Sequence, residues 1–255
     1  MEACASLLER KLAELQAEIV ACRRCPRLVA WREEVARHKP RRYREWEYWS
    51  KPVPGFGDPH ARLLIVGLAP AAHGANRTGR MFTGDRSGAW LYRVLHRFGF
   101  ADRPESRHRE DGLRLRDCYI TAALRCAPPQ NKPQAEELRS CRTFLEREWA
   151  LLKSVRVVIA LGQIAYLTVL RMTSALRPPE AQRPGARPRF RHGLELTLTP
   201  TLTLLASFHP SQQNTFTGRL TEPMFEAIFR RARELLDMAD VTSVQCEMAV
   251  SESVS

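Results

Sequence analysis

Four short and nearly continuous apolar runs recur along the chain, and segments with helical periodicity separate them. The runs lie at residues 63–67, 118–123, 155–161 and 202–207. Strands buried on both faces of a parallel sheet have this composition, because neither face alternates with solvent. Segments with apolar residues at helical spacing lie at 89–98, 134–153 and 163–170. The alternation predicts an α/β fold, a three-layer sandwich with a central, mainly parallel four-stranded sheet flanked by helices.

The two ends of the pattern predict further helices at 5–21 and 222–238, each with one apolar face. Residues 240–255 show no sustained periodicity, so we expect a disordered tail there and a single domain over residues 1–239. Two segments, 103–116 and 173–193, are charged or rich in Pro and Arg, which predicts surface insertions.

The charge of the chain indicates the kind of partner that the protein binds. It has 255 residues with 40 Lys and Arg against 28 Asp and Glu, a formal net charge of +12. Such an excess favours a polyanionic partner, nucleic acid or an anionic membrane surface, although a merely solvated basic face has the same composition. No run of about 18 apolar residues and no apolar leader exists, so we expect no membrane span and a cytoplasmic, nucleoid-associated protein.

The cysteines are seven, an odd number, and without an export signal they favour metal binding or burial over disulfides. Cys22 and Cys25 form a C-x2-C pair after the first predicted helix, and Cys126 and Cys141 follow with fourteen residues between them. Four thiolates suit a [4Fe–4S] cluster or a Cys4 zinc site equally well. Cys118 lies inside a predicted strand and is expected to be a buried apolar residue.

Two loops with candidate chemistry follow the first and the last predicted strands. Ligands of parallel sheets bind at the carboxyl ends of the strands. The loop 67–88 contains five glycines, which let the backbone come close to a ligand. The loop 207–218 carries His209 at the end of its strand, followed by a polar run. Both loops are therefore expected to border one binding site.

The sequences GLAPA at 67–71 and HPS at 209–211 resemble the two active-site motifs of the uracil-DNA glycosylase superfamily. The four-cysteine pattern is similar to that of its iron–sulfur families, and the specific form resembles family 5, the broad-specificity branch. The likeness runs from Cys22 to the final helix. It implies a hydrolase that cleaves the N-glycosidic bond of uracil and other deaminated bases in double- or single-stranded DNA. No lysine lies in either motif, so we expect a monofunctional enzyme that leaves an abasic site. We also expect a monomer.

The resemblance also implies roles for single residues. Ala69 stands where most of the superfamily has Asp, Asn or Glu, which is typical of family 5 and excludes a carboxylate base at this position. Phe82 matches the aromatic residue that stacks on the extruded base. No Asn stands at 121–124, where the sister family reads the uracil edge, so we expect weaker discrimination among bases. The residues expected to line the base pocket are Gly67, Ala69, Pro70, Ala71, Phe82 and Asn131.

His209 matches the histidine of the second motif and is the main catalytic candidate, because it can donate a hydrogen bond to charge developing on the departing base. The candidates for positioning water are His73, Asn76 and Asp85. Each has a structural alternative: Asp85 can complement a helix start, and Asn76 can hold a turn. Asn131 lies in a proline-rich stretch, which favours a loop role over a functional one.

The expected DNA contacts come from two segments. The stretch 23–46 holds nine Lys or Arg against three Glu, and three of its arginines are expected to contact phosphates: Arg41, Arg42 and Arg44. Residues 210–214 are expected to wedge into the minor groove beside the flipped base, with contacts from Pro210, Ser211, Gln212 and Asn214.

Two alternative functions are weighed against this one. An enzyme of the family 4 kind, narrowly specific for uracil, would need an acidic first motif and the strand-two Asn, and both are missing. A catalytically silent nucleic-acid-binding module with a structural Cys4 metal site would explain Ala69. A glycosylase assay on a duplex with a single uracil separates this module from the enzyme.

Overall fold

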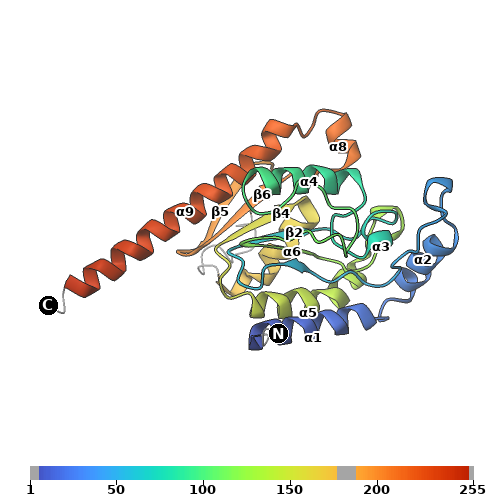
Figure 1. Cartoon of the computed structure of the whole chain (residues 1–255), viewed down its shortest axis with the longest axis horizontal. Coiled ribbons are helices and arrows are strands. Elements are labelled where there is room, and N and C mark those ends of the chain that lie inside the picture. Colours follow the sequence, from blue (N-terminus) through green and yellow to red (C-terminus); the bar gives the residue numbers. More distant parts are fainter. Residues whose placement is uncertain (1–5, 177–187, 253–255) are drawn as a thin grey trace.

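The structure is a computed structural model that describes residues 6–176 and 188–252, with side chains described as far as residue 239 (Figure 1). Its strands are β1 (Phe56–Gly57), β2 (Leu63–Gly67), β3 (Cys118–Ala122), β4 (Val157–Leu161), β5 (Leu194–Thr199) and β6 (Leu202–Ser207). Its α-helices are α1 (Leu7–Ala21), α2 (Pro26–Arg37), α3 (Ala75–Thr78), α4 (Arg86–Arg97), α5 (Ala135–Leu151), α6 (Gln163–Met172), α8 (Gln212–Phe216) and α9 (Glu222–Glu252). Short 3-10 turns are η1 (Arg41–Tyr43), η2 (Pro129–Asn131) and η3 (Ser174–Leu176).

The sheet has six strands in the order β1-β3-β2-β4-β6-β5. The four central strands are parallel and are the four that the apolar runs predict, so the α/β sandwich with a mainly parallel sheet is confirmed. The strand number is wrong: six, not four, because an antiparallel strand is added at each edge. β1 has only two residues, and β5 alternates buried and exposed positions, so neither contains a continuous apolar run.

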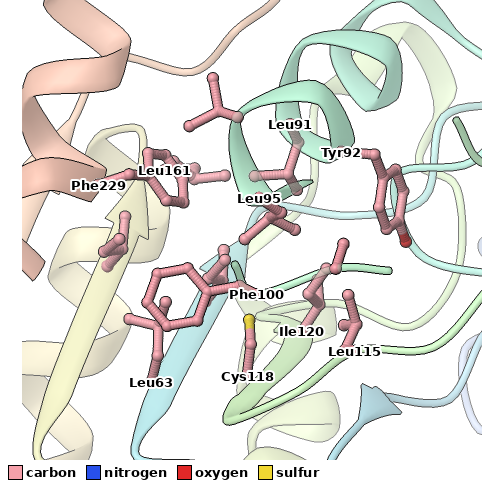
Figure 2. Close-up of a cluster of buried hydrophobic side chains, with 14 of the residues drawn as sticks. Leu63, Leu91, Tyr92, Leu95, Phe100, Leu115, Cys118, Ile120, Leu161 and Phe229 are labelled. Atoms are coloured by element: carbon pink, nitrogen blue, oxygen red, sulfur yellow. The ribbon is translucent and has the colours of Figure 1, made fainter. Parts of the chain in front are cut away.

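The sheet lies between two helical layers (Figure 1). One apolar cluster joins one sheet face to α4 and α9, and a second joins the other face to α1, α5 and α6. Figure 2 shows the first cluster, in which Leu91, Leu95 and Phe229 meet Leu63 and Leu161 of the sheet. Cys118 points into the same cluster and is fully buried, as expected of a packing cysteine. These two clusters hold the strand ends, and hence the loops that follow them, in fixed positions.

Two helices differ from the sequence prediction. α2 lies inside the Arg-rich stretch and starts at Pro26, a favourable first helical residue, and it buries Leu28, Val29 and Val35. α9 continues to Glu252, whereas the sequence predicts a helix end near 238 and a disordered tail at 240–255. No Gly or Pro interrupts the chain between 239 and 252, and Figure 1 shows the helix extending beyond the sheet.

The predicted insertion 103–116 is packed against the loop that follows β2. Arg80 and Asp111 form a buried ion pair at 2.7 Å, and Arg80 also donates to the carbonyl of Arg109 at 2.7 Å. The second predicted insertion, 173–193, falls partly outside the described residues. No helix in the described part of the chain is both long and apolar enough to cross a membrane.

Candidate active site

The loops after β2 and β6 meet at the carboxyl end of the sheet, where only β4 separates the two strands. Their contact is a stack between the rings of Phe82 and His209, with centroids 5.8 Å apart and planes inclined by 27°. The fold therefore brings together His209 of the second motif and Phe82, the residue that the resemblance implies for stacking on the base. An aromatic face beside an imidazole N–H can hold a flat base and donate to its edge.

The backbone around Phe82 depends on two glycines. Phe82 has a left-handed backbone with φ of 53°. A Cβ at Gly67 would lie 2.7 Å from Cζ of Phe82, so the ring packs directly against the last residue of β2. A Cβ at Gly88 would lie 1.6 Å from the Phe82 carbonyl oxygen. Glycine at both positions is thus required for the observed place of the Phe82 ring.

His209 is held from its backbone side. The side-chain Nδ2 of Asn214 and the backbone N–H of Ser211 both donate to the His209 carbonyl at 2.8 Å. Protein surrounds the partly accessible imidazole, and this burial lowers the pKa of His209 to about 4. The ring is consequently neutral at pH 7, with one N–H to donate and one nitrogen to accept.

His192 supports the same loop, and no sequence motif identifies it. The backbone N–H of Phe208 donates to its Nδ1 at 3.2 Å, and its ring stacks on that of Phe208 at 5.3 Å. Burial lowers the pKa of His192 and a hydrogen bond with the backbone of Met224 raises it. Since Nδ1 accepts, the other ring nitrogen carries the proton. His192 therefore fixes the residue that immediately precedes His209.

The three candidates for positioning water lie in the loop after β2 and differ in their contacts. Asn76 is 1% exposed and donates from Nδ2 to the carbonyls of Arg32 and Ala72 at 3.4 and 3.3 Å. Its buried Oδ1 has no hydrogen-bond partner among the described residues. Asn76 therefore has an unused acceptor, although its amide nitrogen is structural.

Asp85 and His73 are both engaged in structural contacts. Asp85 caps α4 through a hydrogen bond from the Gly88 N–H to Oδ1 at 2.9 Å, as its position before a helix predicts. Burial raises the pKa of Asp85, and the backbone hydrogen bonds oppose that shift. His73 shares a hydrogen bond of 3.0 Å between Nδ1 and the Tyr48 hydroxyl, and burial followed by the charges of Arg42 and Arg77 lowers its pKa.

The remaining residues predicted for the base pocket occupy different environments. Pro70 is buried and Ala71 is half-buried. Ala69 is half-buried and packs against the apolar cluster that also contains the four predicted ligand cysteines. Asn131 is exposed in η2 with a left-handed φ of 57°, and the preceding Gln130 is left-handed as well. These features fit a turn residue, which is the role the sequence favours for Asn131.

The arginines predicted to contact DNA belong to a segment tied to the loop after β2. Arg41, Arg42 and Arg44 are all exposed. Next to them, the guanidinium of Arg77 lies over the rings of both Tyr43 and Trp46, 4.1 and 4.0 Å from their centroids. Arg77 is only 4% exposed and donates to the carbonyls of His73 and Gly84 at 2.9 Å. The stack therefore fixes the basic segment beside the candidate active site.

The residues predicted to wedge into DNA have mixed roles in the structure. Pro210 is buried, Ser211 caps α8 by accepting from the Asn214 N–H, and Asn214 holds the His209 carbonyl. Gln212 is exposed at the start of α8. Of this group, Gln212 is the most available for contact with a ligand.

The four predicted ligand cysteines line one cavity, together with residues of α2, α5 and the loop after β3. Two of them accept hydrogen bonds: Cys126 Sγ from Arg32 Nη1 at 3.0 Å, and Cys141 Sγ from the Arg125 N–H at 3.3 Å. Burial raises the pKa of the Cys126 thiol to about 12 and of the Cys141 thiol to about 11. Within the described residues, no three candidate ligands converge closely enough to hold a single metal ion.

Residues 54–233 match the family model described as the Uracil DNA glycosylase superfamily. The chain is 52% identical to the Type-5 uracil-DNA glycosylase of Mycobacterium leprae (strain TN), over 88% of this chain and 95% of that protein. It is 54% identical to the protein of the same description from Thermus thermophilus, over 85% and 94% of the two chains. The Type-4 uracil-DNA glycosylase of Pyrobaculum aerophilum is 32% identical over 49% of this chain and 57% of its own.

Proposed function

The chain belongs to the uracil DNA glycosylase superfamily, and from this premise we propose that it is a DNA repair glycosylase of the type-5 kind. It hydrolyses the N-glycosidic bond of uracil and other deaminated bases in DNA and leaves an abasic site. The observation that carries the proposal is the stack of Phe82 and His209 across the two strand-end loops. The stack gives no support to the alternative of a catalytically silent nucleic-acid-binding module. Binding of DNA alone does not require a neutral hydrogen-bond donor beside an aromatic face.

The chemistry follows from the charges that the reaction creates. A base inside a duplex is unreachable, so the nucleotide is first extruded into the pocket. Cleavage of the bond between sugar and base leaves positive charge on the sugar and negative charge on the base. The face of Phe82 stacks on the base, and the neutral imidazole of His209 donates its N–H to a base oxygen where negative charge gathers. Phosphates of the DNA stabilise the positive sugar.

The attacking water needs an acceptor, and Ala69 supplies none. We assign this role first to Asn76, because its buried Oδ1 is unpaired within the described residues and water is the usual partner of such an atom. Asp85 and His73 rank behind Asn76 because both already have hydrogen-bond partners. Asp85 caps α4, and His73 shares a hydrogen bond with the Tyr48 hydroxyl. An amide that orients water without removing its proton suits a reaction in which the base departs before the water attacks.

The four cysteines fit an iron–sulfur cluster better than a zinc ion. Zinc holds four sulfurs about 2.3 Å from one point, which requires close convergence. A cluster binds each thiolate at a different iron, so the sulfurs stand farther apart around a cavity. Arg125 lines this cavity and Arg32 donates to Cys126 beside it, and both buried arginines retain unpaired side-chain N–H groups within the described residues. We propose that Cys22, Cys25, Cys126 and Cys141 hold a [4Fe–4S] cluster, whose negative charge suits these donors.

DNA is the partner that fits the basic segment. Arg41, Arg42 and Arg44 contact phosphates, while the Arg77 stack keeps them beside the pocket. Pro210, Ser211, Gln212 and Asn214 are proposed to border the groove, with the exposed Gln212 as the side chain most available for contact. We propose that one copy of the chain suffices, with residues 1–239 as its domain, and that it works in the cytoplasm on nucleoid DNA.

The test is excision from matched oligonucleotides. A duplex with one uracil opposite guanine should release free uracil and become cleavable by alkali, whereas the same duplex with cytosine in place of uracil should stay intact. The strand should remain whole before alkali, because no lysine is available for a lyase step. Tight binding of uracil DNA with no base released would instead establish the catalytically silent module.

A further inference from the structure

Phe216 is an apolar residue placed on the surface close to the candidate active site. It ends α8, which begins three residues after His209, and its side chain is 67% exposed. Single exposed apolar residues are common on protein surfaces, so exposure alone indicates nothing. The residues around Phe216 distinguish it from other exposed apolar residues of this chain.

The guanidinium of Arg86 lies over the Phe216 ring, 4.3 Å from the centroid. Arg86 is the first residue of α4 and directly follows Asp85, in the loop that carries Phe82. The pair therefore spans the same two loops as the Phe82–His209 stack, and Figure 1 shows α8 beside the start of α4. Arg86 thus ties Phe216, whose own loop carries His209, to the loop that carries Phe82.

The position of α8 is fixed relative to His209. Ser211 caps the helix, and the side chain of Asn214 donates to the His209 carbonyl at 2.8 Å. Both residues are half-buried. The Phe216 ring, two residues beyond Asn214 in the same helix, is exposed, so this helix holds the ring at a set place relative to His209.

The surroundings of Phe216 are basic. Arg86 and the exposed Arg219 form no ion pair within the described residues, and the Arg219 guanidinium lies over the Phe208 ring at 4.5 Å from its centroid. An exposed aromatic ring beside uncompensated guanidinium groups is typical of nucleic-acid-binding surfaces, because bases stack on the ring and phosphates pair with the charge.

We propose that Phe216 stacks on the bases next to the site vacated when the target nucleotide leaves the duplex, with Arg86 steadying the ring and contacting a nearby phosphate. The proposal rests on the proposed glycosylase function. Extrusion removes the stacking partners of the neighbouring base pair, and an aromatic ring replaces them. The gain exists only in a duplex, and it is largest where the lost pair is well stacked and correctly paired.

The test compares Phe216→Ala with Phe216→Trp on three substrates of one sequence: single-stranded DNA with uracil, the U·G duplex and the U·A duplex. Single-turnover excision by Phe216→Ala should fall by roughly tenfold or more on the U·A duplex, less on U·G and least on the single strand. Phe216→Trp should keep most of the duplex activity. The control is Met238→Ala, since Met238 is similarly exposed, at 61%, on α9.

A second measurement does not depend on chemistry. A 2-aminopurine placed next to the uracil should brighten on binding of the unaltered protein, because its neighbour leaves the stack, and brighten differently with Phe216→Ala. Equal losses on duplex and single strand, or no loss and no change in fluorescence, would overturn the stacking role. Absence of excision on every substrate by the unaltered chain would refute the glycosylase, while the fluorescence would still test Phe216.

Discussion

His209 is the residue whose chemistry depends most on its surroundings. Burial lowers its pKa to about 4, so the folded chain holds the neutral form at pH values where an exposed histidine, with a pKa of about 6.5, takes up a proton. Between these two values the unfolded chain binds the proton and the folded chain does not. The contribution of His209 to stability is therefore complete above about pH 6.5 and is lost as the pH falls toward 4.

The same shift predicts the pH dependence of the reaction. Single-turnover uracil excision should be nearly constant from pH 8 to about pH 5.5 and should decline only as the pH approaches 4, because the neutral imidazole is the donor. The profile is measured with His209→Gln as the comparison, since glutamine donates an N–H without titrating. A decline centred near pH 6.5 in the unaltered chain alone would contradict a neutral donor.

His192 gives a second prediction at the scale of a residue. His192→Phe keeps a ring against Phe208 but removes the acceptor for the Phe208 N–H, so the single-turnover rate should fall by about tenfold, the effect of one lost hydrogen bond of about 1 kcal/mol or more on the loop. His192→Asn restores an acceptor near the position of Nδ1 and should recover part of the rate. Affinity for DNA should stay within about twofold in both variants. An unchanged rate in His192→Phe would show that the loop needs no such support.

The sequence could single out His209 because it lies in a short motif, and Phe82 because the family resemblance implies a stacking aromatic residue at this place after the first motif. It could not predict His192, which lies sixteen positions from Phe208 and meets it only through the pairing of β5 with β6. The free Oδ1 of Asn76 is likewise a property of packing, since it depends on α2 delivering the Arg32 carbonyl to the other end of the amide.

Among the structural elements, the basic segment that contains Arg41, Arg42 and Arg44 predicts the salt dependence of DNA binding. Replacing Arg41, Arg42 and Arg44 together by Ala should reduce the slope of log affinity against log salt by about two to three, because each phosphate contact contributes roughly 0.9. A triple variant of exposed arginines on α5, α6 and α9 is the control: Arg139, Arg171 and Arg230. Equal slopes in the two triple variants would place the DNA footprint elsewhere.

The cysteine cavity predicts composition and colour. Protein purified without oxygen should contain about four irons per chain and show a broad absorbance near 400 nm. Cys141→Ser should lose most of the iron and unfold at lower temperature, because Cys141 is buried between α5 and the loop after β3. Cys118→Ala, which changes a cysteine in the apolar cluster of Figure 2, should keep the iron. Stoichiometric zinc without iron in the unaltered chain would contradict the cluster.

The elements that the sequence predicts well are those with a uniform environment. β2 and β6 match their apolar runs because all or nearly all of their positions are buried. α2 escaped prediction because its short apolar face is embedded among arginines, and one of these, Arg32, is itself buried against Cys126. From sequence alone an arginine is predicted to lie on the surface, because the partner that allows its burial is not apparent.

For the molecule as a whole, the sheet determines where chemistry can occur. Two apolar clusters hold the parallel strands between helical layers. The loops at the carboxyl ends of these strands place Phe82 beside His209, and Arg77 of the first loop contacts Tyr43 of the basic segment. Residues far apart in the sequence thus lie close together. The net charge of +12 adds a general attraction to DNA, which the sequence also shows but cannot locate. The family match over residues 54–233 covers the strands and the two strand-end loops, whereas the basic segment at 41–46 lies outside it.

The most direct test is the single-turnover rate of uracil release from a U·G duplex by the unaltered chain and by His209→Ala, with iron content and DNA affinity measured on the same preparations. The unaltered chain should release uracil, and His209→Ala should do so roughly ten to a thousand times more slowly with nearly unchanged affinity, as expected for one lost transition-state donor. Full activity in a folded, iron-loaded His209→Ala protein would contradict the assignment of His209, and with it the account of this site.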